Sequence, residues 1–63
     1  MTRQYAIDKA KIYFREQNRS FYVVQMDASE FEVMDKEELD RVMQSGRIRR
    51  DAIIFSMESD PNE

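Results

Sequence analysis

The sequence predicts a single small α+β domain of order α-β-β-α-β, with a three-stranded, mostly antiparallel sheet and two helices on one face. Three observations predict this class. Apolar residues recur at helical spacing over residues 2–17. Three later segments have strand composition, at residues 21–26, 30–34 and 52–57. A second helix, between the last two strands, has a marked start and stop. The 63 residues suffice for one domain with a modest core.

The first segment, residues 2–17, is predicted to be an amphipathic helix. Its main apolar side consists of Ala6, Ile7, Ala10, Tyr13 and Phe14. Tyr5 and Ile12 form a second, narrower stripe, which is either a dimer contact or an ordinary exposed pair. A competing interpretation makes residues 11–15 a strand that pairs with residues 20–24, because Ile12, Tyr13 and Phe14 have high β propensity. The alanines and the polar spacing favour the helix.

A turn at residues 18–20 leads into two strands. Residues 21–26 are aromatic and β-branched with apolar side chains on both faces, which indicates a central strand covered on two sides. Residues 30–34 alternate, with Phe31 and Val33 predicted to face the core. Glu30 and Glu32 then face water, so this segment is predicted to be an antiparallel partner with one solvated face.

The second helix has both ends marked. Asp35 is a suitable N-cap, and Glu38 three residues later is placed for a capping-box contact. Gly46, the single glycine, fits the left-handed position just beyond the helix end. The apolar face consists of Leu39, Val42 and Met43.

The last strand is predicted at residues 52–57, with Ile53, Phe55 and Met57 on one face. Residues 58–63 have turn composition and are predicted to form a disordered tail, so the domain comprises residues 1–57.

Composition excludes several classes of function. The chain has no His, Cys or Trp, which rules out a disulfide framework and a Cys/His zinc site. It shows no secretory signal, and its longest apolar run, residues 21–24, is far too short for a membrane span. We therefore expect a cytoplasmic protein, either a monomer or a homodimer, with no cofactor and no membrane partner.

The carboxylates do not form a recognisable catalytic pattern. Asp35 and Glu38 are explained by the helix start, and no Ser has a His or Cys partner. Asp27, Glu30 and Glu32 lack the spacing of a calcium loop, and one glycine cannot form a phosphate-binding loop. We expect no enzyme activity.

Residues 21–57 also carry a resemblance to a known family. The residues concerned are Phe21-Tyr22, Phe31, Val33, Glu37-Glu38-Leu39, Gly46-Arg47-Ile48 and Asp51 followed by Ile53-Ile54. This pattern resembles a GYF-type module of the bacterial kind, which implies a peptide-binding or protein-docking module. The chain departs from that family in having no Trp and no Gly-Pro before the helix.

Charge is segregated along the chain, although the net charge is only −3. An acidic hairpin–helix surface, predicted to dock on another protein, consists of Glu30, Glu32, Glu37 and Asp40. The alternative is a nucleic-acid-associated protein, with Tyr13 or Tyr22 stacking on bases. Its basic residues would be Lys11, Arg15, Arg47, Arg49 and Arg50. The acidic composition, with a pI near 4.9, favours the protein-docking hypothesis.

Overall fold

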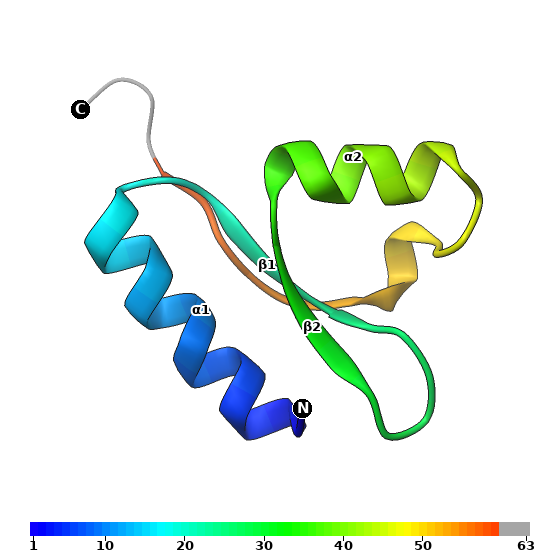
Figure 1. Ribbon diagram of the computed structural model, residues 1–63, viewed down its shortest axis with the longest axis horizontal. Helices are drawn as coiled ribbons and strands as arrows, with labels where there is room; N and C mark the ends of the chain where they lie inside the picture. The colour runs from blue at the N-terminus through cyan, green and yellow to red at the C-terminus, as the bar shows by residue number, and fades with distance from the viewer. Residues whose placement is uncertain (60–63) are drawn as a thin grey trace.

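The computed structural model describes residues 1–59 and confirms the element order α-β-β-α-β (Figure 1). Its elements are α1 (Arg3–Gln17), β1 (Phe21–Gln25), β2 (Phe31–Asp35), α2 (Lys36–Gln44), the short 3-10 helix η1 (Arg50–Ala52) and β3 (Ile53–Met57). Residues 60–63, most of the tail predicted to be disordered, lie outside the described residues. Neither helix within residues 1–59 has the length and apolar content needed to cross a membrane.

The sheet is antiparallel throughout, in the order β2-β1-β3. The central residue of β1, Val23, lies opposite Val33 of β2 and Phe55 of β3. Four of the five β1 residues are buried, in agreement with the central position predicted from their apolar character. The core therefore consists of two layers of side chains, one on each side of this strand.

The two helices lie on opposite faces of the sheet, and the prediction that both occupy one face was wrong (Figure 1). Ala6 and Ala10 of α1 pack with Val23, whereas α2 packs on the face that carries Val24. Both valines are 0% exposed. The physical reason is the apolar character of both faces of β1, because two helices on one face would leave the other face in water.

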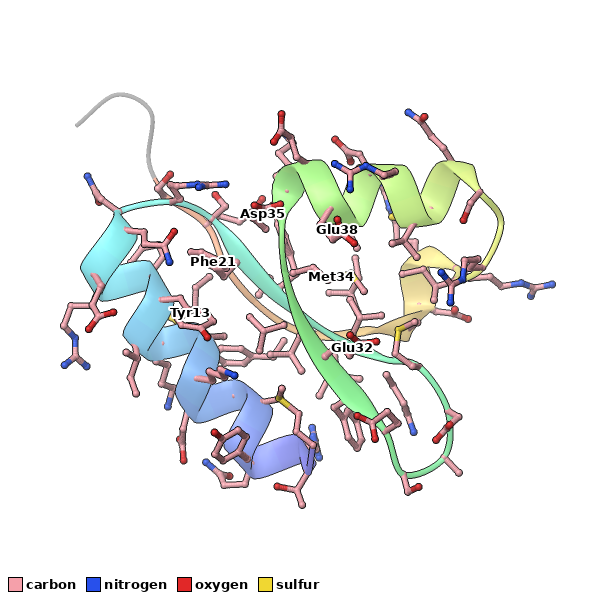
Figure 2. The ribbon with its side chains drawn as sticks, in the orientation of Figure 1. Tyr13, Phe21, Glu32, Met34, Asp35 and Glu38 are labelled. Atoms are coloured by element: carbon pink, nitrogen blue, oxygen red, sulfur yellow. The ribbon has the colours of Figure 1, made fainter. Side chains whose placement is uncertain are left out.

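Helix α1 runs without interruption through residues 11–15, so the competing strand interpretation was wrong. Its first turn is capped by Thr2, whose hydroxyl accepts from the Tyr5 N–H at 3.2 Å. It ends at Asn18, which has a left-handed φ of 54° and donates its N–H to the Phe14 carbonyl at 2.9 Å. The turn places the Phe21 ring against the Tyr13 ring, with ring centroids 5.5 Å apart (Figure 2).

Helix α2 has the ends that the sequence predicts. The Asp35 carboxylate accepts from the Glu38 N–H at 2.8 Å, and its second oxygen accepts from Arg19 at 2.6 Å (Figure 2). The Glu38 carboxylate accepts a hydrogen bond from Arg41 at 2.7 Å. In a capping box it would instead reach back to the backbone N–H of Asp35. Gly46 adopts a φ of 79°, and its N–H donates to the Met43 carbonyl.

Strand β3 contains an irregularity that the sequence pattern does not reveal. Val23 lies opposite Phe55 and Val24 opposite Ile53, so Ile54 is an extra residue between them. Ile53 consequently packs on the α2 side of the sheet, whereas Ile54 and Phe55 pack on the α1 side. The prediction that Ile53, Phe55 and Met57 share one face was therefore wrong for Ile53.

Candidate functional site

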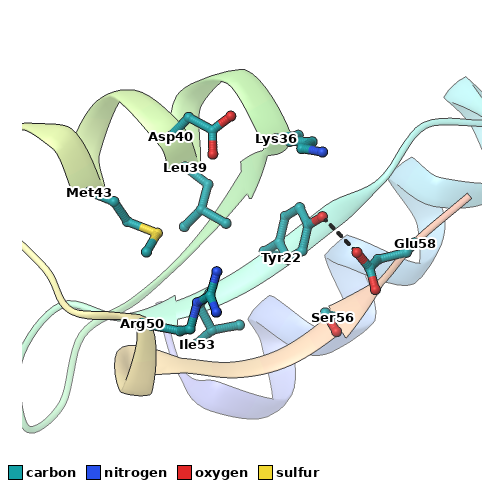
Figure 3. A pocket seen from close by; sticks show the side chains of 9 residues that line it. All are labelled: Tyr22, Lys36, Leu39, Asp40, Met43, Arg50, Ile53, Ser56 and Glu58. Carbon is teal, nitrogen blue, oxygen red and sulfur yellow. Dashed lines mark hydrogen bonds between the residues drawn. The ribbon is translucent and has the colours of Figure 1, made fainter.

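A groove lies between α2 and β3 on the α2 face of the sheet (Figure 3). It exists because α2 packs on β1 and β2 and does not extend over β3. The groove has a volume of about 490 Å³. Its lining comes from three segments, β1, α2 and residues 50–58, and consists of Tyr22, Lys36, Leu39, Asp40, Met43, Arg50, Ile53, Ser56 and Glu58.

The apolar part of this groove is an exposed continuation of the core. Leu39 and Tyr22 are buried members of the cluster on the α2 side, and Met43 and Ile53 are partly buried against it. These side chains are held by a helix and two paired strands, so the surface is formed before anything binds. Such a preformed apolar surface can accept an apolar side chain of a partner.

Two hydrogen bonds fix the wall of the groove where β3 ends, and Figure 3 shows the one between Tyr22 and Glu58. The Tyr22 hydroxyl donates to Glu58 Oε2 at 3.2 Å, and the Ser59 N–H donates to Ser20 Oγ at 3.0 Å. Burial, followed by the nearby Glu58 carboxylate, raises the pKa of the Tyr22 phenol above 10.0. At neutral pH the phenol is therefore protonated and acts as a donor.

The rim of the groove carries charges of both signs. Lys36 and Asp40 lie one turn apart on α2, Arg50 comes from η1 and Glu58 follows β3. Lys36, Asp40, Arg50 and Glu58 are all exposed. Their mixture favours a partner segment that carries both an acidic and a basic side chain beside an apolar one.

The structure distributes the four predicted acidic residues over different places. Asp40 lines the groove, and Glu37 is exposed in the first turn of α2. Glu32 is exposed on β2 and lies opposite Val24, on the α2 side of the sheet. Glu30 precedes β2 and forms an ion pair with the Met1 amine. The length of β2 thus separates Glu30 from Glu37 and Asp40 on α2.

The predicted basic residues fall on opposite faces of the sheet. Lys11 and Arg15 belong to α1 and border a second hollow, of about 470 Å³, together with Phe14, Asn18 and Met57. Arg47 and Arg49 are exposed in the connection after α2, and Arg50 lines the groove. The sheet lies between the two groups, so Lys11 and Arg15 do not extend the patch around Arg49.

Sequence reasoning did not identify Ser56 and Glu58 as site residues. Ser56 lies opposite Tyr22 in the sheet, and Glu58 approaches the same tyrosine from beyond β3. Of Tyr22, Ser56 and Glu58, only Tyr22 had a signal in the sequence. It alternates with Val23 along the strand and therefore lies on the face toward the second helix. The other two positions depend on the register of β3, which the extra residue Ile54 shifts.

Comparisons with known proteins do not add an assignment. No protein-family model, curated protein or solved structure matches the chain. Among residues 1–59, no three Asp, Glu, His or Cys side chains gather in a way that could hold a metal ion. The resemblance of residues 21–57 to a GYF-type module remains a prediction. The groove between α2 and β3 is therefore the candidate functional site.

Proposed function

We propose that this protein is a small non-enzymatic protein-interaction module, a regulator, adaptor or inhibitor, that docks a segment of another protein in the groove between α2 and β3. One observation carries the proposal. The groove combines an apolar lining, supplied by Leu39, Met43 and Ile53, with a charged rim on elements that are rigidly paired or packed. Protein-binding sites show this combination of a desolvated centre and a polar rim.

The acidic first half of α2 gives this docking surface its charge preference. Glu37 and Asp40 are exposed one turn apart, and Asp40 lines the groove directly. A basic side chain on the partner would meet Asp40 while an apolar neighbour enters between Leu39 and Ile53. Of the acidic docking surface predicted from the sequence, Glu37 and Asp40 therefore belong to the proposed docking surface.

The titratable groups of the groove support a binding role. The Tyr22 phenol has a raised pKa and donates to Glu58, so both groups are engaged in holding the wall. Lys36 and Asp40 are exposed to water on α2. Acid–base catalysis generally uses paired groups in contrasting environments, and Lys36 and Asp40 share a solvated rim.

Affinity capture with two charge-reversed variants tests the proposal. Asp40→Arg changes the rim of the groove, whereas Asp8→Arg makes the same change on the exposed side of α1, across the sheet. We expect a nuclease-resistant, stoichiometric protein partner to be retained by the wild type and by Asp8→Arg and lost by Asp40→Arg. Equal retention by both variants would contradict docking in the groove.

A second candidate, association with nucleic acid, is favoured by one observation. Arg47 and Arg49 are exposed in a single connection, next to the exposed Arg50. This candidate predicts an affinity for nucleic acid that falls steeply with salt. It also predicts loss of binding in the double variant Arg49→Glu/Arg50→Glu and no effect of Glu37→Lys. The docking proposal predicts that Glu37→Lys weakens binding of the protein partner.

A further inference from the structure

The two edges of the sheet differ in how they are protected. Strand β2 carries Glu32 and Asp35, and its first N–H, from Phe31, donates to the Met1 carbonyl at 3.2 Å. Strand β3 has the sequence Ile-Ile-Phe-Ser-Met, which contains no charge. Natural edge strands usually carry charges or a covering segment, because open backbone groups otherwise pair with another strand. By these two features β2 is protected, whereas the uncharged stretch of β3 after the extra residue Ile54 is open.

The side chains of β3 are also incompletely covered. Four of its five residues are apolar, and all four are only partly buried; these are Ile53, Ile54, Phe55 and Met57. In contrast, β1 is buried at four of its five positions. The groove and the second hollow both border β3, the groove at Ile53 and Ser56 and the second hollow at Met57. Within residues 1–59, no strand lies on the outer side of β3.

We propose that β3 pairs antiparallel with β3 of a second copy of this chain, which joins the two sheets into one six-stranded sheet. The charges at the two ends of β3 favour this partner and this direction. Arg49, Arg50 and Asp51 precede the strand and give that end a net positive charge, whereas Glu58 follows it; all four are exposed. Antiparallel pairing places Arg50 of each copy at the same end as Glu58 of the other, whereas parallel pairing would bring like charges together.

Such a pairing closes on itself. The same strand is used by both copies, so the contact is two-fold symmetric and leaves no second β3 exposed. The remaining outer edges are the two β2 strands, whose Glu32 and Asp35 side chains oppose further addition. The expected assembly is therefore a dimer and not a filament. This inference needs no other protein, but Arg50, Ser56 and Glu58 also line the groove, so its test uses the purified chain alone.

Mass measurement across concentrations tests the dimer. By sedimentation or light scattering, the purified chain should shift from 7.6 kDa toward about twice that mass as its concentration rises from micromolar to about 1 mM. Ser56→Lys places a charge on the exposed side of β3 and should hold the protein at monomer mass. Ser29→Lys makes the same substitution in the exposed β1–β2 loop and should dimerise like the wild type. Circular dichroism establishes that both variants are folded.

A charge exchange tests the antiparallel direction. Glu58→Arg alone should weaken the dimer, and the double variant Arg50→Glu/Glu58→Arg should restore it. A monomer at all concentrations would overturn the proposal, and so would growth into open-ended polymers. A dimer that survives Ser56→Lys but is lost in Ile12→Ser would also overturn the proposal. The contact would then belong to the Tyr5/Ile12 stripe of α1, where Tyr5 is 57% and Ile12 47% exposed.

Discussion

Replacing Asp35 by Ala should destabilise the protein more than its position near the surface suggests. The carboxylate caps α2 through the Glu38 N–H at 2.8 Å and pairs with Arg19 at 2.6 Å. Loss of an N-cap costs about 1 kcal/mol, within a range of roughly 0.5–2. The ion pair adds about 0.2–1 kcal/mol, because the Arg19 side chain is 52% exposed and water screens the attraction. We expect a loss of about 1.5 kcal/mol in the free energy of unfolding.

This loss is large for a domain of 63 residues, whose total stability should be roughly 3–9 kcal/mol. It corresponds to a fall in Tm of about 6–12 °C. Urea unfolding followed by circular dichroism measures it directly. Asp35→Asn keeps the capping oxygen and removes the ion pair, so it should lose only the smaller part. If Asp35→Asn is as damaging as Asp35→Ala, or if both are neutral, the capping argument is wrong.

Three further predictions concern the backbone, the buried phenol and the two faces of β1. Gly46→Ala should lower the free energy of unfolding by about 1–2 kcal/mol because φ is 79° at this position, although a Cβ there would meet open space. Chemical denaturation measures the loss, and Gln44→Ala in the preceding helix is the control. The raised pKa of Tyr22 means that the folded state holds the phenolic proton more tightly than the unfolded state does. This contribution to stability is complete below the unfolded pKa near 10.0 and is lost as pH rises through the higher folded pKa, so alkaline unfolding should be shallower in Tyr22→Phe. Val23→Ala and Val24→Ala should each cost about 2 kcal/mol in urea unfolding, and tolerance of either change would contradict the burial of both faces.

The sequence predicted the unit around α2 well because its signals are local. Asp35 and Gly46 mark the two ends of the helix through contacts with residues three positions away. The same locality explains α1, where the alanines and the polar spacing favour a helix and Asn18 ends it. Such signals depend on backbone geometry and capping, which any fold containing these helices must satisfy.

The arrangement of the helices required a comparison between segments. The apolar character of both Val23 and Val24 already implied two covered faces, so placing both helices on one face contradicted the burial expected for β1. The extra residue Ile54 has no sequence signature, because either isoleucine could face either layer. The groove was equally hidden, since Tyr22 and Glu58 are 36 positions apart and meet only in the folded chain.

The position of β1 between two layers has a consequence for how the molecule opens. Both core clusters draw on this one strand, with Phe21 and Val23 in one and Tyr22 and Val24 in the other. If α1 detached, one side of β1 would be exposed to water while α2 still covered its other side. Neither layer can therefore unfold alone, because its loss would expose side chains of β1, and β1 also holds the other layer. Amide hydrogens of β1 should then exchange with solvent only through complete unfolding, and residues 21–57 separated from α1 should not retain a stable fold.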